Sequence, residues 1–143
     1  GTLPVPLIIG FAKAAELARS DLASRSQRLE GLRNQLWEGL KQRQPTLLLN
    51  GDAMTRLPHN LNITIPGVSG SKLHRALRSR VACSSGSACS RGEPSHVLMA
   101  LGRSRQEAEA SLRLSLGRGT SDRDINQAIQ ALNDVIHKLR HKP

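Results

Sequence analysis

The chain has 143 residues, enough for one domain that buries its own core, and it carries a net charge of +10 from 21 Lys and Arg against 11 Asp and Glu. Two cysteines are too few for a disulfide framework, and one Trp, one Phe and no Tyr leave almost no aromatic platform for stacking single-stranded nucleic acid. No apolar run approaches the roughly 20 residues of a membrane span. We therefore expect a soluble, cytoplasmic domain with an aliphatic core, and the scattered basic residues argue against nucleic acid as its partner.

Apolar residues at helical spacing begin at Leu7 and continue to about Gln44, which predicts one long helix or two helices with a bend between Ser20 and Ser24. Shorter segments follow, with alternately strand-like and helix-like patterns. We predict strands at residues 46–49, 61–65, 81–83 and 112–116. We predict helices at 95–101, 106–110 and 121–140, and a further helix that ends at Leu77 and is capped by either Ser69 or Ser71. The last helix begins with a predicted capping box at residues 121–124. The sum is an α+β fold in which helices cover a small sheet.

Residues 84–92 are rich in Ser and Gly, show no periodicity, and include Cys89. A cysteine with small polar neighbours and Arg91 beside it can hold a thiolate, so Cys89 is a candidate nucleophile. The alternative is a cysteine that is merely tolerated in a surface linker. Cys83 follows an apolar pair and is typical of a structural cysteine. The spacing of the two does not match a zinc knuckle, so we predict no metal site, and a reducing cytosol disfavours a disulfide between them.

Arg113 lies between two leucines in a predicted strand, so its side chain projects to the face opposite theirs. An arginine at such a position is often only part of the solvent-facing side of a sheet. The functional alternative is a carboxylate clamp, because the planar guanidinium binds a carboxylate through two parallel hydrogen bonds. Both interpretations stay open on the residues alone.

Four segments together resemble landmarks of the group I cysteine desulfurases, in the right order and over essentially the whole chain. The most specific is Ser84-Ser85-Gly86-Ser87-Ala88-Cys89-Ser90, followed by Glu93-Pro94-Ser95, which resembles the catalytic loop of that family. The other three are residues 1–6, 57–62 (Leu-Pro-His-Asn-Leu-Asn) and 112–118 (Leu-Arg-Leu-Ser-Leu-Gly-Arg). Each of these three would be a weak signal alone.

This resemblance implies the small C-terminal domain of a fold-type I pyridoxal-phosphate enzyme, entered by a long helix. Residues 1–44 would be the interdomain segment with that helix, and 45–143 the C-terminal small domain with the catalytic cysteine loop. Such enzymes convert L-cysteine to L-alanine and hold the sulfur as a persulfide. The resemblance implies that Cys89 is the nucleophile and that Arg113 binds the substrate carboxylate. Thr2 would reach the cofactor phosphate of the neighbouring subunit in a homodimer.

The sulfur acceptor would be an iron–sulfur scaffold protein or a protein of tRNA thiolation. In the family, the lysine that anchors pyridoxal phosphate follows a Ser-x-His motif, and this sequence has no such motif. The histidine that stacks on the cofactor and the aspartate that binds its pyridine nitrogen in the family are likewise missing, so we predict that these 143 residues alone neither hold the cofactor tightly nor desulfurate cysteine. The chain also starts without Met, and we expect it to be the middle of a longer protein. Two alternatives remain: a basic module that binds RNA or an acidic protein, and a related lyase acting on cysteine or selenocysteine.

Overall fold

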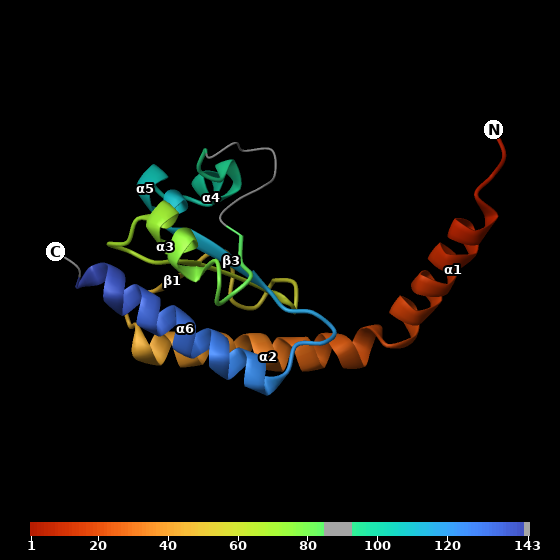
Figure 1. Cartoon of the computed structure of the whole chain (residues 1–143), viewed down its shortest axis with the longest axis horizontal. Helices are drawn as coiled ribbons and strands as arrows, with labels where there is room; N and C mark the ends of the chain where they lie inside the picture. Colours follow the sequence, from red (N-terminus) through yellow and green to blue (C-terminus); the bar gives the residue numbers. More distant parts are fainter. Residues whose placement is uncertain (85–92, 142–143) are drawn as a thin grey trace.

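The computed structural model describes residues 1–84 and 93–141. The described part is an α+β fold, as predicted, built from a small sheet and helices on both sides of it (Figure 1). Its elements in chain order are α1 (Val5–Ser20), α2 (Leu22–Arg43), β1 (Leu48–Leu49), β2 (Asn60–Thr64), α3 (Gly70–Leu77), α4 (His96–Ala100), α5 (Arg105–Glu109), β3 (Ser111–Ser115) and α6 (Asp122–Arg140).

The three strands form one antiparallel sheet in the order β1-β2-β3. Leu61 and Ile63 of β2 lie opposite Leu114 and Leu112 of β3, and all four side chains are buried. Opposite residues of antiparallel strands project to the same face. One face of the sheet is therefore apolar, and it shares a core with α2 and α6, which pack side by side against it (Figure 1).

Of the two predicted alternatives, two helices with a bend are observed, because the long helical segment breaks at Asp21. This carboxylate forms ion pairs with Arg25 at 2.9 Å and with Arg118, beyond β3, at 2.6 Å. Arg28 donates to the carbonyl groups of Arg118 and Thr120. These contacts tie the start of α2 to the connection between β3 and α6.

The two halves of the helical segment differ in burial. In α2, the apolar stripe from Leu29 to Leu40 is buried in the core. In α1 no residue is buried, and Phe11 is 78% exposed. Figure 1 shows α1 extending away from the sheet.

The strand predicted at residues 81–83 is wrong. The backbone N–H of Val81 donates to the carbonyl of Leu77 at 2.9 Å, so this residue still belongs to the turn that ends α3. Pairing with β3 occurs one residue past the predicted strand, as an isolated bridge between Ser84 and Arg113. In the described part of the chain, no helix is both long and apolar enough to cross a bilayer.

Candidate functional site

A row of polar residues crosses the sheet on the face opposite the apolar core. Asn62 of β2 is the cross-strand partner of Arg113 of β3. One residue beyond β1, the backbone N–H of Asn50 donates to the carbonyl of Asn62 at 2.9 Å, which continues the β1–β2 pairing. Because paired residues share a face, Asn50, Asn62 and Arg113 lie side by side. We call these three residues the polar row.

The polar row begins at a buried amide that two arginines hold. Asn50 is 5% exposed, and its Oδ1 accepts a hydrogen bond from Nε of Arg103 at 2.6 Å. Its backbone carbonyl accepts one from Nη2 of Arg56 at 2.9 Å. Burial, reinforced by the charge of Arg33, lowers the pKa of Arg56. Two arginine side chains therefore fix the position of Asn50 at this end of the row.

Two buried hydroxyl groups continue the network. Oγ1 of Thr64 and Oγ of Ser111 lie 2.7 Å apart on opposite strands, and Oδ1 of Asn50 lies 3.0 Å from Oγ1 of Thr64, so the single hydroxyl proton of Thr64 can be donated to either acceptor. Ser111 also donates to the carbonyl of Glu107 in α5 at 2.7 Å. The buried polar atoms on this face thus satisfy one another, as buried polar groups in folded proteins do, and they fix the position of the row relative to α5.

Arg113 ends the row with an exposed side chain, while Leu112 and Leu114 on either side are buried. The predicted projection away from the leucines is thereby confirmed. The guanidinium makes no hydrogen bond or ion pair with any residue in 1–84 or 93–141. An unpaired guanidinium on a rigid strand is a ready binding group for a carboxylate or another anion.

The backbone of Arg113 pairs with that of Ser84, which directly precedes the segment that contains Cys89 in the sequence. Ser84 and Arg113 exchange two backbone hydrogen bonds, with N–O distances of 2.7 and 3.0 Å. Ser84 is the last described residue before residues 85–92, and Cys89 itself lies outside the described residues. Thr2 lies in the exposed segment before α1, and no interaction in the described part joins it to Arg113.

Cys83 is a half-buried thiol that packs against the core, in agreement with a structural role. Its Sγ lies 3.9 Å from Nδ1 of His74. Burial raises the pKa of the Cys83 thiol and lowers the pKa of the His74 ring. Both groups are therefore held neutral, which is the opposite of the charged pair that activates a nucleophilic cysteine.

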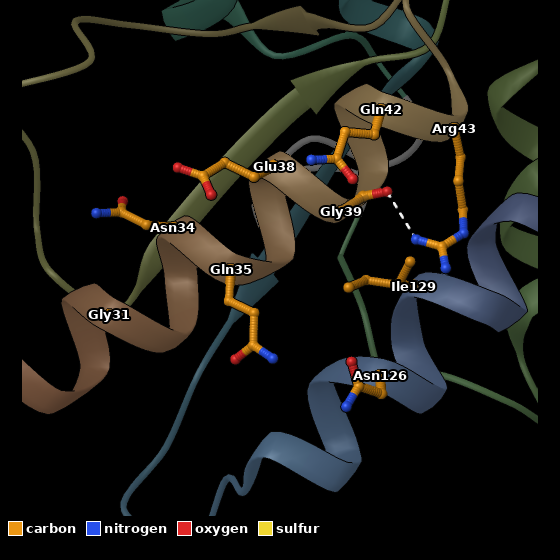
Figure 2. Close-up of a pocket in the computed structure, with 9 residues that line it drawn as sticks. All are labelled: Gly31, Asn34, Gln35, Glu38, Gly39, Gln42, Arg43, Asn126 and Ile129. Carbon is orange, nitrogen blue, oxygen red and sulfur yellow. Dashed lines mark hydrogen bonds between the residues drawn. The ribbon is translucent and has the colours of Figure 1, made fainter.

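A shallow open groove of about 380 Å³ lies between α2 and α6 (Figure 2). Its walls are mainly amide side chains, with Ile129 of α6 projecting toward Gly39 of α2. A Cβ added at Gly39 would lie 2.5 Å from Cδ1 of Ile129, so the groove exists where the two helices approach closely. Neither Thr2 nor Arg113 lines it.

Within residues 1–84 and 93–141, no three His, Cys, Asp or Glu side chains gather closely enough to hold a metal ion. The described donors instead suit an anionic organic ligand. Among them, the exposed guanidinium of Arg113 can bind a carboxylate or a phosphate group.

The family model for class-V aminotransferases matches residues 1–128. The chain belongs to the class-V aminotransferase family. Among curated members, the chain is 44% identical over 142 residues to "Cysteine desulfurase IscS" of Photorhabdus laumondii, and 42% identical to the protein of that name from Shewanella baltica. Each match covers 98% of this chain and 35% of the relative.

Solved structures agree with this assignment. A structure described as a NifS-like protein matches 97% of this class-V aminotransferase chain with a TM-score of 0.83 and 26% identity. The NifS-like protein from Rickettsia africae matches 96% with a TM-score of 0.83 and 27% identity. The chain covers 35% and 36% of these structures. It therefore spans about a third of the length of the relatives it matches.

Proposed function

We propose that this chain is the C-terminal part of a cysteine desulfurase that takes sulfur from L-cysteine and leaves L-alanine. The observation that carries the proposal is the identity of 42–44% over nearly the whole chain to proteins named cysteine desulfurase. The polar row supports it, since it presents an unpaired guanidinium next to the strand bridge from which the Cys89 segment departs.

In this proposal Cys89 is the sulfur carrier. Its thiolate attacks the sulfur of the substrate, a sulfur–sulfur bond forms, and the carbon–sulfur bond of cysteine breaks. The electron pair of the broken bond stays with the carbon skeleton, which takes up protons and leaves as alanine. The carrier keeps the sulfur as a persulfide, so the reaction needs no external oxidant or reductant. The small residues on both sides of Cys89 suit a thiol that must reach a substrate and then an acceptor.

Arg113 would bind the carboxylate of L-cysteine in this scheme. Pyridoxal phosphate, the cofactor that the family resemblance implies, acts as an electron sink when bound. Thr2 would contact its phosphate across a homodimer interface, whereas the lysine that anchors it would lie outside this chain. The 143 residues would also need the remaining polypeptide for activity.

The persulfide would pass to an acceptor such as an iron–sulfur scaffold protein or a tRNA-thiolation protein. We place the reaction in the cytoplasm because the carrier must remain a free thiol between turnovers, and a reducing compartment keeps it so. The division into an interdomain segment at residues 1–44 and a small domain at 45–143 is part of the same proposal.

The test uses the full-length polypeptide that contains this chain, supplied with pyridoxal phosphate and L-cysteine. Sulfide, formed in the presence of a reducing thiol, and alanine are measured for the wild type, Cys89→Ala and Cys83→Ala. We expect Cys89→Ala to abolish both products and Cys83→Ala to retain them. Equal activity in Cys89→Ala and wild type would move the sulfur chemistry to another residue. No activity in any of the three proteins would refute the proposed reaction.

A further inference from the structure

The orientation of two side-chain amides in the polar row follows from a single guanidinium. Arginine carries only donors, so the atom of Asn50 that accepts from Nε of Arg103 must be the oxygen. The Nδ2 group of Asn50 then faces Asn62 and donates to its Oδ1 at 2.9 Å. Asn62 must therefore turn its own Nδ2 group away from Asn50. The positions of the oxygen and nitrogen atoms of both amides therefore follow from their hydrogen-bond partners.

The free amide group of Asn62 lies beside Arg113. The two residues are cross-strand partners on one face of the sheet, and the Cβ atoms of such partners are about 5 Å apart. Neither Nδ2 of Asn62 nor the guanidinium of Arg113 has a hydrogen-bond partner among residues 1–84 and 93–141. Two adjacent unpaired donors match the two oxygens of a carboxylate.

The charges at the other end of the row are largely balanced. Arg56 and Arg103 both donate to Asn50, the carboxylate of Glu107 lies 3.8 Å from Arg103, and the charge of Asp52 acts on Arg56. The observation that favours a small anionic ligand is therefore the local pair of donors at Asn62 and Arg113.

We propose that Asn62 is a second ligand for the carboxylate of the amino-acid substrate, donating from Nδ2 beside the guanidinium of Arg113. Arg103 is the positioning residue, because it fixes the direction of the Asn62 amide through Asn50. This inference rests on the proposed function, since it assigns the substrate of that same site. A phosphate group would use the same donors, so the experiment must separate the two anions.

The probe is L-alanine, which has the substrate's carboxylate and no sulfur, titrated calorimetrically into the full-length holoenzyme. Asn62→Ala removes the donor, and we expect it to weaken L-alanine binding by about 10-fold or more, as the loss of a hydrogen bond to a charged group does. Asn62→Asp keeps the shape but replaces the donor by a negative charge, so it weakens binding further. Asn60→Ala, two residues earlier on the same face of β2, is the matched control and leaves binding unchanged.

The positioning role of Arg103 has its own readout. Arg103→Leu frees the Asn50 amide to turn over, so we expect an increase of about threefold in the KM for L-cysteine with kcat retained. Arg103→Lys keeps a group with donors only, and it restores the KM. An effect on kcat alone, or an Arg103→Lys variant as weak as Arg103→Leu, would overturn this part of the inference.

The outcomes separate the two proposals. A wild-type holoenzyme that releases no alanine from L-cysteine refutes the proposed function. A wild type that desulfurates L-cysteine, together with an Asn62→Ala variant that binds L-alanine as tightly as wild type, refutes only the role of Asn62. If Asn62→Ala weakens inorganic phosphate binding and leaves L-alanine binding intact, the row holds a phosphate and the carboxylate assignment is wrong.

Discussion

Gly70, the first residue of α3, lies directly against the backbone carbonyl of Glu109 at the end of α5. A Cβ added at Gly70 would lie 1.8 Å from that oxygen, and backbone cannot move aside as a side chain can. We expect Gly70→Ala to lower the free energy of unfolding by about 3 kcal/mol, the upper end of the usual overpacking cost. The measurement is denaturant unfolding followed by circular dichroism.

Gly31 is the matched control for this substitution. It lies within α2, and no atom lies within 4 Å of the position that its Cβ would take. Gly31→Ala should therefore raise the free energy of unfolding by about 0.5–1 kcal/mol through helix propensity alone. A Gly70→Ala protein as stable as Gly31→Ala would contradict the close contact between α3 and α5.

The capping box of α6 predicts a specific response to acid. The Ser121 side chain and backbone both donate to the Asp124 carboxylate, and these hydrogen bonds lower the pKa of Asp124. Because the folded-state value is below the ordinary value of about 3.9, this contribution to stability is complete above pH 4 and is lost as the pH falls through the lower, folded-state pKa. We expect Ser121→Ala to cost about 1 kcal/mol at pH 7 and to flatten the acid dependence.

Urea unfolding at pH 7 and at pH 3 measures both effects. Ser69→Ala is the control, because Ser69 occupies the N-cap of α3 but its side chain accepts no capping hydrogen bond. We expect this substitution to change stability by a few tenths of a kcal/mol. A similar loss for Ser69→Ala and Ser121→Ala would show that the capping box contributes nothing of its own.

Leu132 lies in the core that α2, α6 and the sheet share, so its truncation tests this packing. It is fully buried, so Leu132→Ala leaves a cavity and should cost about 2–5 kcal/mol. Leu22→Ala makes the same chemical change on a helical side chain that is 57% exposed, and it should alter stability by less than about 0.5 kcal/mol. Thermal unfolding of both variants tests this difference, and equal shifts in Tm would contradict the described packing.

The Cys83 thiol should react slowly at neutral pH. Burial raises its pKa, so the reactive thiolate is scarce at pH 7 and becomes abundant only above the ordinary value of about 8.5. The test is the rate of iodoacetamide labelling from pH 7 to pH 10 in a Cys89→Ser background. Labelling in denaturant provides the control rate for an unperturbed thiol. Equal rates at pH 7 in the folded and denatured protein would refute this protection.

The sequence patterns located most elements to within two residues because the apolar period of α2, α6 and β3 reports directly on burial. The capping box at Ser121 was predicted from its residues, whereas the Ser104–Glu107 box of α5 was missed although it has the usual Ser-x-x-Glu spacing. Arg33 was also missed. It is only 4% exposed because it bonds the carbonyl of Leu57, a contact that no local pattern reveals.

The candidate site was predictable only in part for a similar reason. Alternation with leucines predicted the direction of the Arg113 side chain, and the structure confirms it. The neighbours of Arg113 depend on strand register, which brings Asn50 and Asn62 from distant parts of the chain to the same row. Register is set by the burial of one whole face and by the connecting turns, so the short patterns of single strands do not encode it.

The contrast between α1 and α2 has a consequence for the exchange of backbone amide hydrogens with solvent. A helix of 16 residues without buried side chains is held mainly by its own backbone hydrogen bonds, and isolated helices of that length are marginal in water. Amides of α1 would then exchange through frequent local opening, whereas amides beyond Leu29 would exchange only when the core opens. The border between fast and slow amide exchange would thus lie within a nearly continuous helical segment. A partner surface that covers α1 would slow the exchange of the α1 amides.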